Sequence, residues 1–557
     1  MMRRKSLLGV SLAAVLGVAT FGLPLRAADE PIDYDGLNKI KDQGLVETNS
    51  QVMDIASWLT DVYGPRLTGS PNISKAGAWA VETMKGWGLE NVAMEPWAMA
   101  PGDTSNGGFP QGWSNEKFYM AAVSPQSFPI PGTPTAWTPG TNGLVRGEVM
   151  LVTGTTQEEL QPLAASLKGK WILTAEAPDV AAYWSAPASR YTKEELADME
   201  SPERRTEFGQ AQPAGRGGGR GGFGRGGAGG FNRDEFFQQS GVLGVLSTQS
   251  RGHGIYTIGG GSRTADPNAS LTRITIPAEQ YGRLARMIAH KQAVTVEADI
   301  RNVYAPNPPM FNVVGEIRGT ERPDEVVMLG AHFDSWHAST GATDNAAGSA
   351  AMMEAMRILK QSGVRLKRTV RIGLWTGEEQ GLIGSRNYVA EHFGNTTAGR
   401  GGGGRGARGA APPQRMPATP AHAKFAGYFN IDNGTGAIRG VYLQGNQAVA
   451  PIFRAWMEPF HSIGMTTLTI SNTGGTDHQS FDGAGLPGFQ FIQDEVEYGS
   501  MTHHTNLDSY ERLQPEDMRR NATIAAAFAY LTANRDDLLP RKPDTPLPGG
   551  RGRGGEE

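Results

Sequence analysis

Histidine and acidic residues gather in one stretch near the middle of the chain. An apolar run ends in His332 and Asp334, a polar loop then brings Asp344, and a second apolar run, TVRIGLWT, ends in the neighbouring pair Glu378 and Glu379. Because the chain contains no cysteine, a protein-bound metal would have to be held by His, Asp and Glu side chains. The pattern favours a hydrolase site built around two metal ions.

His332 and Asp334 lie two residues apart at a predicted strand end, so both side chains point to the same side. We predict that His332 binds metal and that Asp334 accepts a hydrogen bond from the imidazole, which fixes its tautomer. A buried histidine without metal is the alternative for His332. Asp344, in GATDNAAG, could instead cap the helix that follows, but Asn345 can cap equally well.

Glu378 and Glu379 diverge, because adjacent side chains of an extended segment point in opposite directions. One can bind metal while the other acts as general base toward the attacking water, and the residue types alone do not say which. Later, Asp432 ends the strand-like run AGYFNID, where an ordinary turn aspartate is the alternative. One member of the pair His503 and His504 is expected to supply a fifth ligand.

One more acid–histidine pair, Asp477 and His478, lies in the segment GGTDHQSFDGAG. The glycines on both sides predict a loop that could line the cleft. The pattern leaves open whether either side chain takes part in chemistry.

The elements that must position these side chains alternate from residue 301 onward. Strand-like runs such as EVVMLGAHFD and TVRIGLWT are separated by helix-like segments, the first of them near residues 345–362. Such alternation predicts an α/β fold with a mixed, mostly parallel sheet covered by helices, and chemistry at the carboxyl ends of the strands. The runs MFNVVGEIRG and EVVMLGAHFD are expected to pair as a hairpin.

The length of 557 residues indicates more than one domain, and the character of the sequence changes along the chain. Short β-rich runs without a cluster of His, Asp and Glu predict an accessory domain inserted in the enzyme. The predicted parts are a signal peptide at 1–27, the start of the catalytic domain at 28–140, the inserted domain at 141–298, the main catalytic part at 299–540 and a disordered tail at 541–557.

The amino terminus predicts export. A basic start at Arg3, Arg4 and Lys5 precedes an apolar run and the small residues Ala27 and Ala28, as in a cleaved secretory signal. An uncleaved membrane anchor is the alternative, since the apolar run is near the lower length limit for spanning a bilayer. We expect a secreted or periplasmic protein that has no membrane contact once the signal is removed.

Arginine and glycine dominate two internal segments, 213–231 and 399–415. Such repeats can bind RNA when exposed, but they also form flexible loops because they lack apolar groups. With a net charge of only −4, the chain as a whole has no attraction for nucleic acid. We expect loops and no nucleic-acid partner, with an RNA-binding protein as the alternative.

Six separated segments resemble, in order, the co-catalytic di-zinc exopeptidases, which include bacterial leucyl aminopeptidases, glutamate carboxypeptidase and carboxypeptidase Q. These segments are GAHFDSW, ATDNAAG, LWTGEEQGLIGS, NIDNGTG, TDHQSF and HHTNLDSY. The carboxypeptidase Q branch is the most similar, chiefly through HFDSWH, WTGEEQG and the double histidine. The Arg/Gly segments depart from the family pattern but fall outside these motifs.

The resemblance implies a phosphorylase/hydrolase-like α/β fold with two Zn²⁺ ions and an inserted protease-associated-like domain. Asp344 would bridge the two ions. His332 and Asp432 would complete one zinc site. Glu379 and His504 would complete the other.

For catalysis, the resemblance implies that Glu378 is the general base, that Asp334 supports His332 and that His503 helps to steady the oxyanion. The implied function is an exported, carboxypeptidase Q-like metallo-exopeptidase that hydrolyses short peptides or dipeptides, and a homodimer is compatible with it. Alternatives are an aminopeptidase of the same family, a related di-zinc amidohydrolase or cyclase, and a catalytically silent binding ectodomain.

Overall fold

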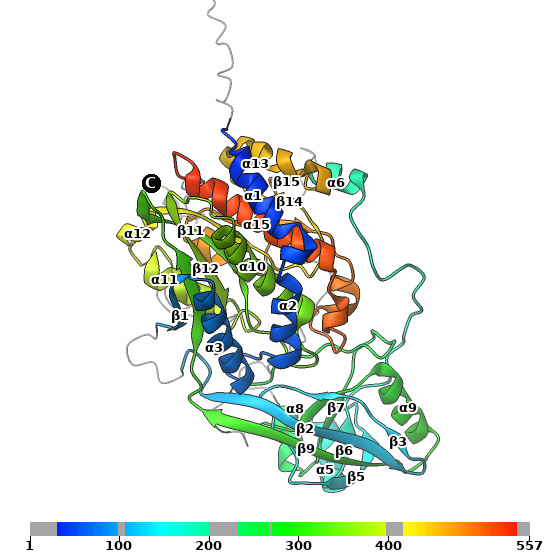
Figure 1. Ribbon diagram of the computed structural model, residues 1–557. Helices are drawn as coiled ribbons and strands as arrows, with labels where there is room; N and C mark the ends of the chain where they lie inside the picture. Colours follow the sequence, from blue (N-terminus) through cyan, green and yellow to red (C-terminus); the bar gives the residue numbers. More distant parts are fainter. Residues whose placement is uncertain are drawn as a thin grey trace, which may run out of the picture.

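Two eight-stranded sheets organise the chain in the computed structural model, the second lying below the first in Figure 1. The structure describes residues 30–98, 106–200, 231–263, 266, 270–396 and 416–542. The predicted signal peptide, nearly all of both Arg/Gly segments and most of the predicted tail lie outside these ranges. Within them, no helix combines the length and apolar character needed to cross a bilayer.

The first sheet is mixed, and its centre is parallel. In spatial order its strands are β1 (Glu90–Pro96), β10 (Phe311–Ile317), β12 (Arg368–Trp375), β11 (Arg322–His332), β13 (Phe425–Asn430), β16 (Gly488–Gln493), β14 (Ile438–Tyr442) and β15 (Thr467–Thr469). β11 pairs in parallel with both β12 and β13, and β13 pairs in parallel with β16. The predicted mixed, mostly parallel sheet is confirmed, and so is the strand–helix–strand unit that links β11 to β12 through α10 (Ala347–Gln361).

The predicted hairpin between β10 and β11 is wrong, because β12 lies between these two strands. β12 pairs antiparallel with β10 and parallel with β11. The short link after β10 is held by the start of β12 instead: Gly319 N–H donates to Thr369 Oγ1 at 3.1 Å. A short connection therefore joins two strands that are not neighbours.

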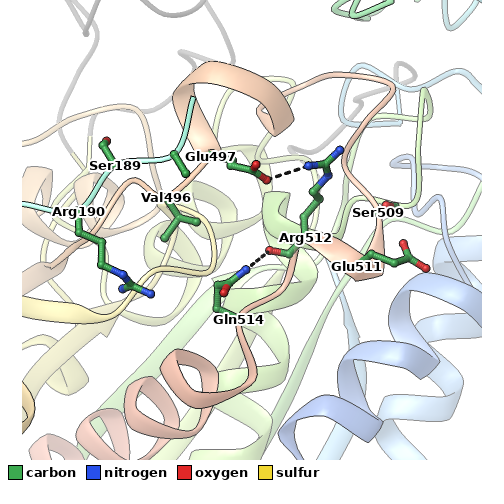
Figure 2. A pocket seen from close by; sticks show the side chains of 9 residues that line it. Ser189, Arg190, Val496, Glu497, Ser509, Glu511, Arg512 and Gln514 are labelled. Carbon is green, nitrogen blue, oxygen red and sulfur yellow. Dashed lines mark hydrogen bonds and ion pairs between the residues drawn. The ribbon is translucent and has the colours of Figure 1, made fainter. Parts of the chain in front are cut away.

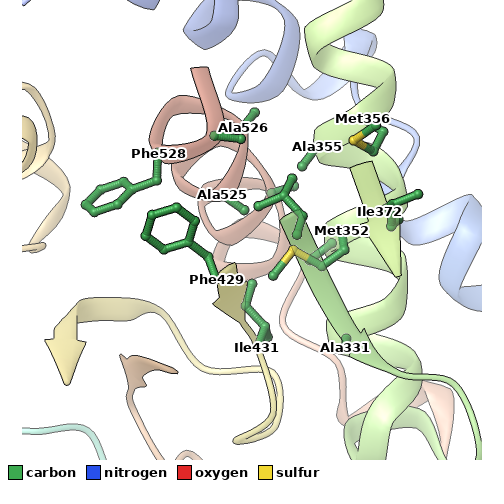
Figure 3. Packing of buried hydrophobic residues seen from close by; sticks show 14 of the residues in the cluster. Ala331, Met352, Ala355, Met356, Ile372, Phe429, Ile431, Ala525, Ala526 and Phe528 are labelled. Atoms are coloured by element: carbon green, nitrogen blue, oxygen red, sulfur yellow. The ribbon is translucent and has the colours of Figure 1, made fainter. Parts of the chain in front are cut away.

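Helices cover both faces of this sheet. On one face, α10 and α15 (Pro515–Asn534) share a core with α1 (Tyr34–Gly44), α2 (Val52–Ser57) and α3 (Pro71–Gly86). The other face is covered by α11 (Ile383–His392) and α14 (His478–Gly483). Figure 3 shows Met352 of α10 and Phe528 of α15 gathered over the strands. The alanine-rich helices α10 and α15 pack densely against the strands, next to the strand ends that carry the acids.

The second sheet has its own core. Its strands, in spatial order, are β3 (Phe128–Pro129), β2 (Gln111–Ser124), β9 (Thr295–Pro306), β5 (Val145–Leu151), β6 (Trp171–Leu173), β7 (Gly244–Ser247), β8 (Arg273–Thr275) and β4 (Thr133–Pro134). Trp171 and Tyr281 are buried in this core, the latter on α9 (Ala278–Ala289). The sheet begins before the predicted boundary at 141 and ends after that at 298, because β2 and β9 pair along most of their length.

An ion pair inside the first core supports a stability prediction. Glu354 and Arg357 of α10 are almost fully buried, with Arg357 Nε 2.6 Å from Glu354 Oε2. Replacing Glu354 by Gln leaves the guanidinium uncompensated in the interior, so we expect the free energy of unfolding to fall by about 3–5 kcal/mol. Urea unfolding followed by circular dichroism measures this loss.

The control for this prediction is Glu82→Gln in α3. Glu82 pairs with Lys85 at 3.2 Å, but both side chains are exposed. Its removal should change stability by less than about 1 kcal/mol. Equal losses in the two variants would contradict the view that burial makes the Glu354–Arg357 pair important.

Candidate metal centre and active site

The carboxyl ends of three neighbouring strands carry the predicted site residues. His332 is the last residue of β11, Glu378 and Glu379 follow the end of β12, and Asp432 follows the end of β13. Because these strands run parallel, their carboxyl ends meet at one edge of the sheet. Asp344 reaches the same edge from η5 (Ala342–Ala346), directly before α10.

One group of donor atoms surrounds the imidazole of His332. Its Nε2 lies 3.1 Å from Asp344 Oδ1 and 3.1 Å from Asp432 Oδ1. All three side chains are buried, and their ligand atoms lie within 4.8 Å of one another. The structure therefore brings together a histidine and two carboxylates that the sequence keeps far apart.

A second group of donor atoms forms on the other oxygen of Asp344. His504 Nε2 lies 3.3 Å from Asp344 Oδ2 and 3.0 Å from Glu379 Oε2. His503 stacks on His504, with 3.8 Å between ring centroids, and its Nε2 is 3.9 Å from the same Asp344 oxygen. His504 is thus the nearer imidazole, and Asp344 contributes one oxygen to each group.

The donor set fits divalent metal ions. Asp344 Oδ2 and Glu379 Oε1 are buried, and neither accepts a hydrogen bond from any residue in the described ranges. Burial and the neighbouring Asp344 carboxylate raise the pKa of Glu379 well above its usual value. Cations would remove this repulsion, and imidazole nitrogens with carboxylate oxygens are the donors that zinc takes in catalytic sites.

Asp334 differs in detail from its predicted role. His332 Nδ1 lies 3.0 Å from the backbone carbonyl oxygen of Asp334 but 3.7 Å from its carboxylate, so the carbonyl is the imidazole's hydrogen-bond acceptor. The carboxylate instead accepts the N–H groups of Glu378 and Glu379, both at 3.3 Å, and the hydroxyl of Thr68 at 2.8 Å. Asp334 therefore positions the glutamate pair, while its backbone holds the histidine.

Glu378 has surroundings that suit a proton acceptor. Burial raises the pKa of its carboxyl well above the usual value. The His332 charge opposes this, and the carboxylates of Asp432 and Asp477 reinforce it. No ion pair to Glu378 occurs within the described part of the chain, whereas Glu379 faces His504. The side chains of Glu378 and Glu379 therefore have different surroundings, as expected for adjacent side chains that diverge.

Asp477 and His478 separate in the structure. Asp477 is fully buried near the site, and burial raises its pKa to about 7. His478 faces elsewhere: its Nε2 lies 3.0 Å from Gln444 Nε2 and 3.1 Å from the carbonyl oxygen of Thr473. Burial lowers the pKa of His478 to about 4, which keeps the imidazole neutral and structural.

Two positioning residues escaped the sequence-based prediction. The Asp508 carboxylate accepts the N–H groups of Thr343 at 2.6 Å and Asp344 at 3.1 Å. Arg66 is fully buried and donates to the carbonyl oxygens of Phe333 and Gly341, both at 2.9 Å. Asp508 lies within the motif HHTNLDSY, but Arg66 lies in a segment that reads only as a turn, so no local signal marks its contacts.

A surface pocket of about 580 Å³ is separate from this chemistry. Figure 2 shows Arg512 directed at Glu497, an ion pair of 3.0 Å, with Gln514 bonded to the Arg512 carbonyl oxygen. Arg190 at its rim pairs with Asp494 and Asp517. None of the predicted ligands lines it, and both of its arginines are paired with carboxylates of the chain, so the metal centre remains the candidate site.

Comparison with known proteins agrees with the geometry of the site. Residues 312–529 match the model of peptidase family M28. Carboxypeptidase Q of Mus musculus is 26% identical over 484 residues, covering 87% of this chain and 86% of that protein. Carboxypeptidase Q of Homo sapiens is 24% identical over 492 residues, covering 87% and 85%.

A solved structure shares the fold. The crystal structure of a peptidase M28 precursor from Shewanella amazonensis superposes with a TM-score of 0.60 at 21% identity, covering 91% of this chain and 99% of that chain. These findings confirm the resemblance to the carboxypeptidase Q branch. The part of the chain that carries the metal centre therefore matches peptidase family M28, and the similarity to carboxypeptidase Q along most of the chain supports a zinc-dependent peptidase.

Proposed function

We propose that this chain is an exported exopeptidase that holds two zinc ions and hydrolyses short peptides or dipeptides, with carboxypeptidase Q-like activity. The observation that carries the proposal is the placement of Asp344, whose two oxygens face His332 and His504 separately. Similarity to carboxypeptidase Q over 87% of the chain supports the choice of substrate class.

In this proposal Asp344 would offer one oxygen to each of two ions. His332 and Asp432 would hold one ion, and Glu379 and His504 would hold the other, in agreement with the two groups of donor atoms. When bound, zinc polarises a peptide carbonyl and lowers the pKa of a water molecule.

The chain's own residues then handle protons and position. Glu378 accepts the proton of the attacking water and passes it to the leaving amine, a role that its raised pKa favours. Asp334 keeps Glu378 in place by accepting its backbone N–H. His503, which stacks on His504 at the edge of the site, donates to the developing oxyanion.

The variant Glu378→Gln tests the base. Glutamine preserves the shape of the side chain but cannot accept the proton, so we expect kcat on a dipeptide to fall by about 10²–10⁴-fold. Zinc content, measured by mass spectrometry of the purified protein, should not change. The exposed Glu194→Gln serves as the control. Near-normal turnover of Glu378→Gln would overturn the assignment.

The variant Asp344→Asn tests the bridge. An amide nitrogen cannot take the place of the second carboxylate oxygen, so one donor is lost from one of the two groups. We expect less than two zinc ions per chain and a loss of activity that added zinc does not restore. Wild-type protein stripped by a chelator should regain activity with zinc. Full zinc content in Asp344→Asn would contradict the bridging role.

A further inference from the structure

A loop from the second sheet's domain lies against the segment that carries the two site histidines. Ile258 N–H donates to the carbonyl oxygen of His504 at 2.9 Å. Tyr256 N–H donates to Asn506 Oδ1 at 2.9 Å, and Asn506 N–H donates back to the Tyr256 carbonyl oxygen at 3.2 Å. One side of the metal centre is therefore bordered by residues from the other domain.

Arg251 belongs to this loop and lies close to His503. Its Nη2 donates to the carbonyl oxygen of Gly499 at 2.8 Å. The neighbouring carbonyl, that of Tyr498, accepts the His503 N–H at 2.9 Å, and the rings of Tyr498 and His503 are 4.9 Å apart. The guanidinium is thus anchored one residue from the backbone that positions His503.

The charge of Arg251 has no partner in the described part of the chain. Its Nη1 is buried and donates no hydrogen bond there, and no carboxylate of that part forms an ion pair with it. Of the two glutamates in the adjacent segment, Glu497 is occupied by Arg512 at 3.0 Å, and no ion pair joins Glu495 to Arg251 within the described residues. Buried charges in folded proteins are normally paired, and this half-buried guanidinium has no carboxylate partner in the described residues, so an anion supplied by a substrate would complete its pairing.

Residues 180–189 of the same domain, here called the strap, lie against this loop. Tyr183 stacks on His253 with 4.1 Å between ring centroids. Gly252 has φ +66°, and a Cβ there would meet Val180 Cγ1 at 2.0 Å, so strap and loop are in direct contact. The strap continues to Ser189, which forms a β-bridge with Val496, and to α6 (Lys193–Glu200) beside β15 in Figure 1. The residue after Arg251 therefore touches the strap, while the Arg251 guanidinium bonds to Gly499.

We propose that Arg251 binds the free α-carboxylate of a peptide substrate and so makes the enzyme select peptides with a free carboxyl terminus. The inference rests on the proposed peptidase function. A guanidinium pairs with a carboxylate through two parallel N–H···O bonds, which gives orientation as well as attraction. With the carboxylate fixed at Arg251, the last peptide bond of a short substrate is the one presented beside His503.

The test compares two substrates with two variants. The substrates are one dipeptide and the same dipeptide with an amidated carboxyl terminus. We expect Arg251→Gln to lower kcat/KM for the free dipeptide by about 10- to 100-fold and to change that for the amide less than about twofold. Arg251→Lys, which keeps the charge but loses the paired geometry, should fall between. Arg301→Gln, an exposed arginine of β9, is the control.

A binding measurement separates this inference from the proposed function. Calorimetry of the Glu378→Gln variant with an N-acetylated amino acid and with its amide should show tighter binding of the free acid, lost when Arg251→Gln is added. Equal losses on both substrates, or equal binding of acid and amide, would overturn the role of Arg251. Absence of hydrolysis in the wild type would overturn the proposed function, and the binding data would still decide on Arg251. Circular dichroism checks that each variant is folded.

Discussion

The shared carboxylate of Asp344 sets the conditions that the rest of the site must meet. Its oxygens face histidines from two distant segments, so its position must be fixed independently of either one. Asp508 does this by accepting the backbone N–H groups of Thr343 and Asp344. Arg66 ties the neighbouring Gly341 to the loop after His332. The position of the Asp344 carboxylate thus depends on these backbone contacts as well as on its contacts with the two histidines.

Crowding of negative charge is the second constraint. Glu378, Glu379, Asp432 and Asp477 surround one imidazole in a buried region, where like charges repel strongly. Cations between the carboxylates would relieve this repulsion, and a rigid support behind the cluster holds the side chains in place. The alanine-rich packing of α10 and α15 on the parallel strands supplies that support (Figure 3). This core lies next to the strand ends that carry the charges.

Sequence patterns predicted much of the fold and failed where pairing is not local. The periodicity of TVRIGLWT and of the helix before it correctly indicates β12 and α10. The hairpin of β10 and β11 was wrong because strand order depends on contacts that a short connection does not reveal. Similarly, the start of the second sheet at Gln111 follows from its pairing with β9, which lies far along the chain.

By itself the sequence determined the kinds of donor groups and their places at strand ends, because these depend on residue type and local period. The sequence also gives the residue types at Asp508 and Arg251, but nothing near them in the sequence indicates which residues they contact. Only the tertiary structure decided that the Asp334 carboxylate holds Glu378 and Glu379, and that a loop of the second domain borders His503. Side-chain contacts between distant segments depend on how sheets and domains are arranged, and no short stretch of sequence encodes that arrangement.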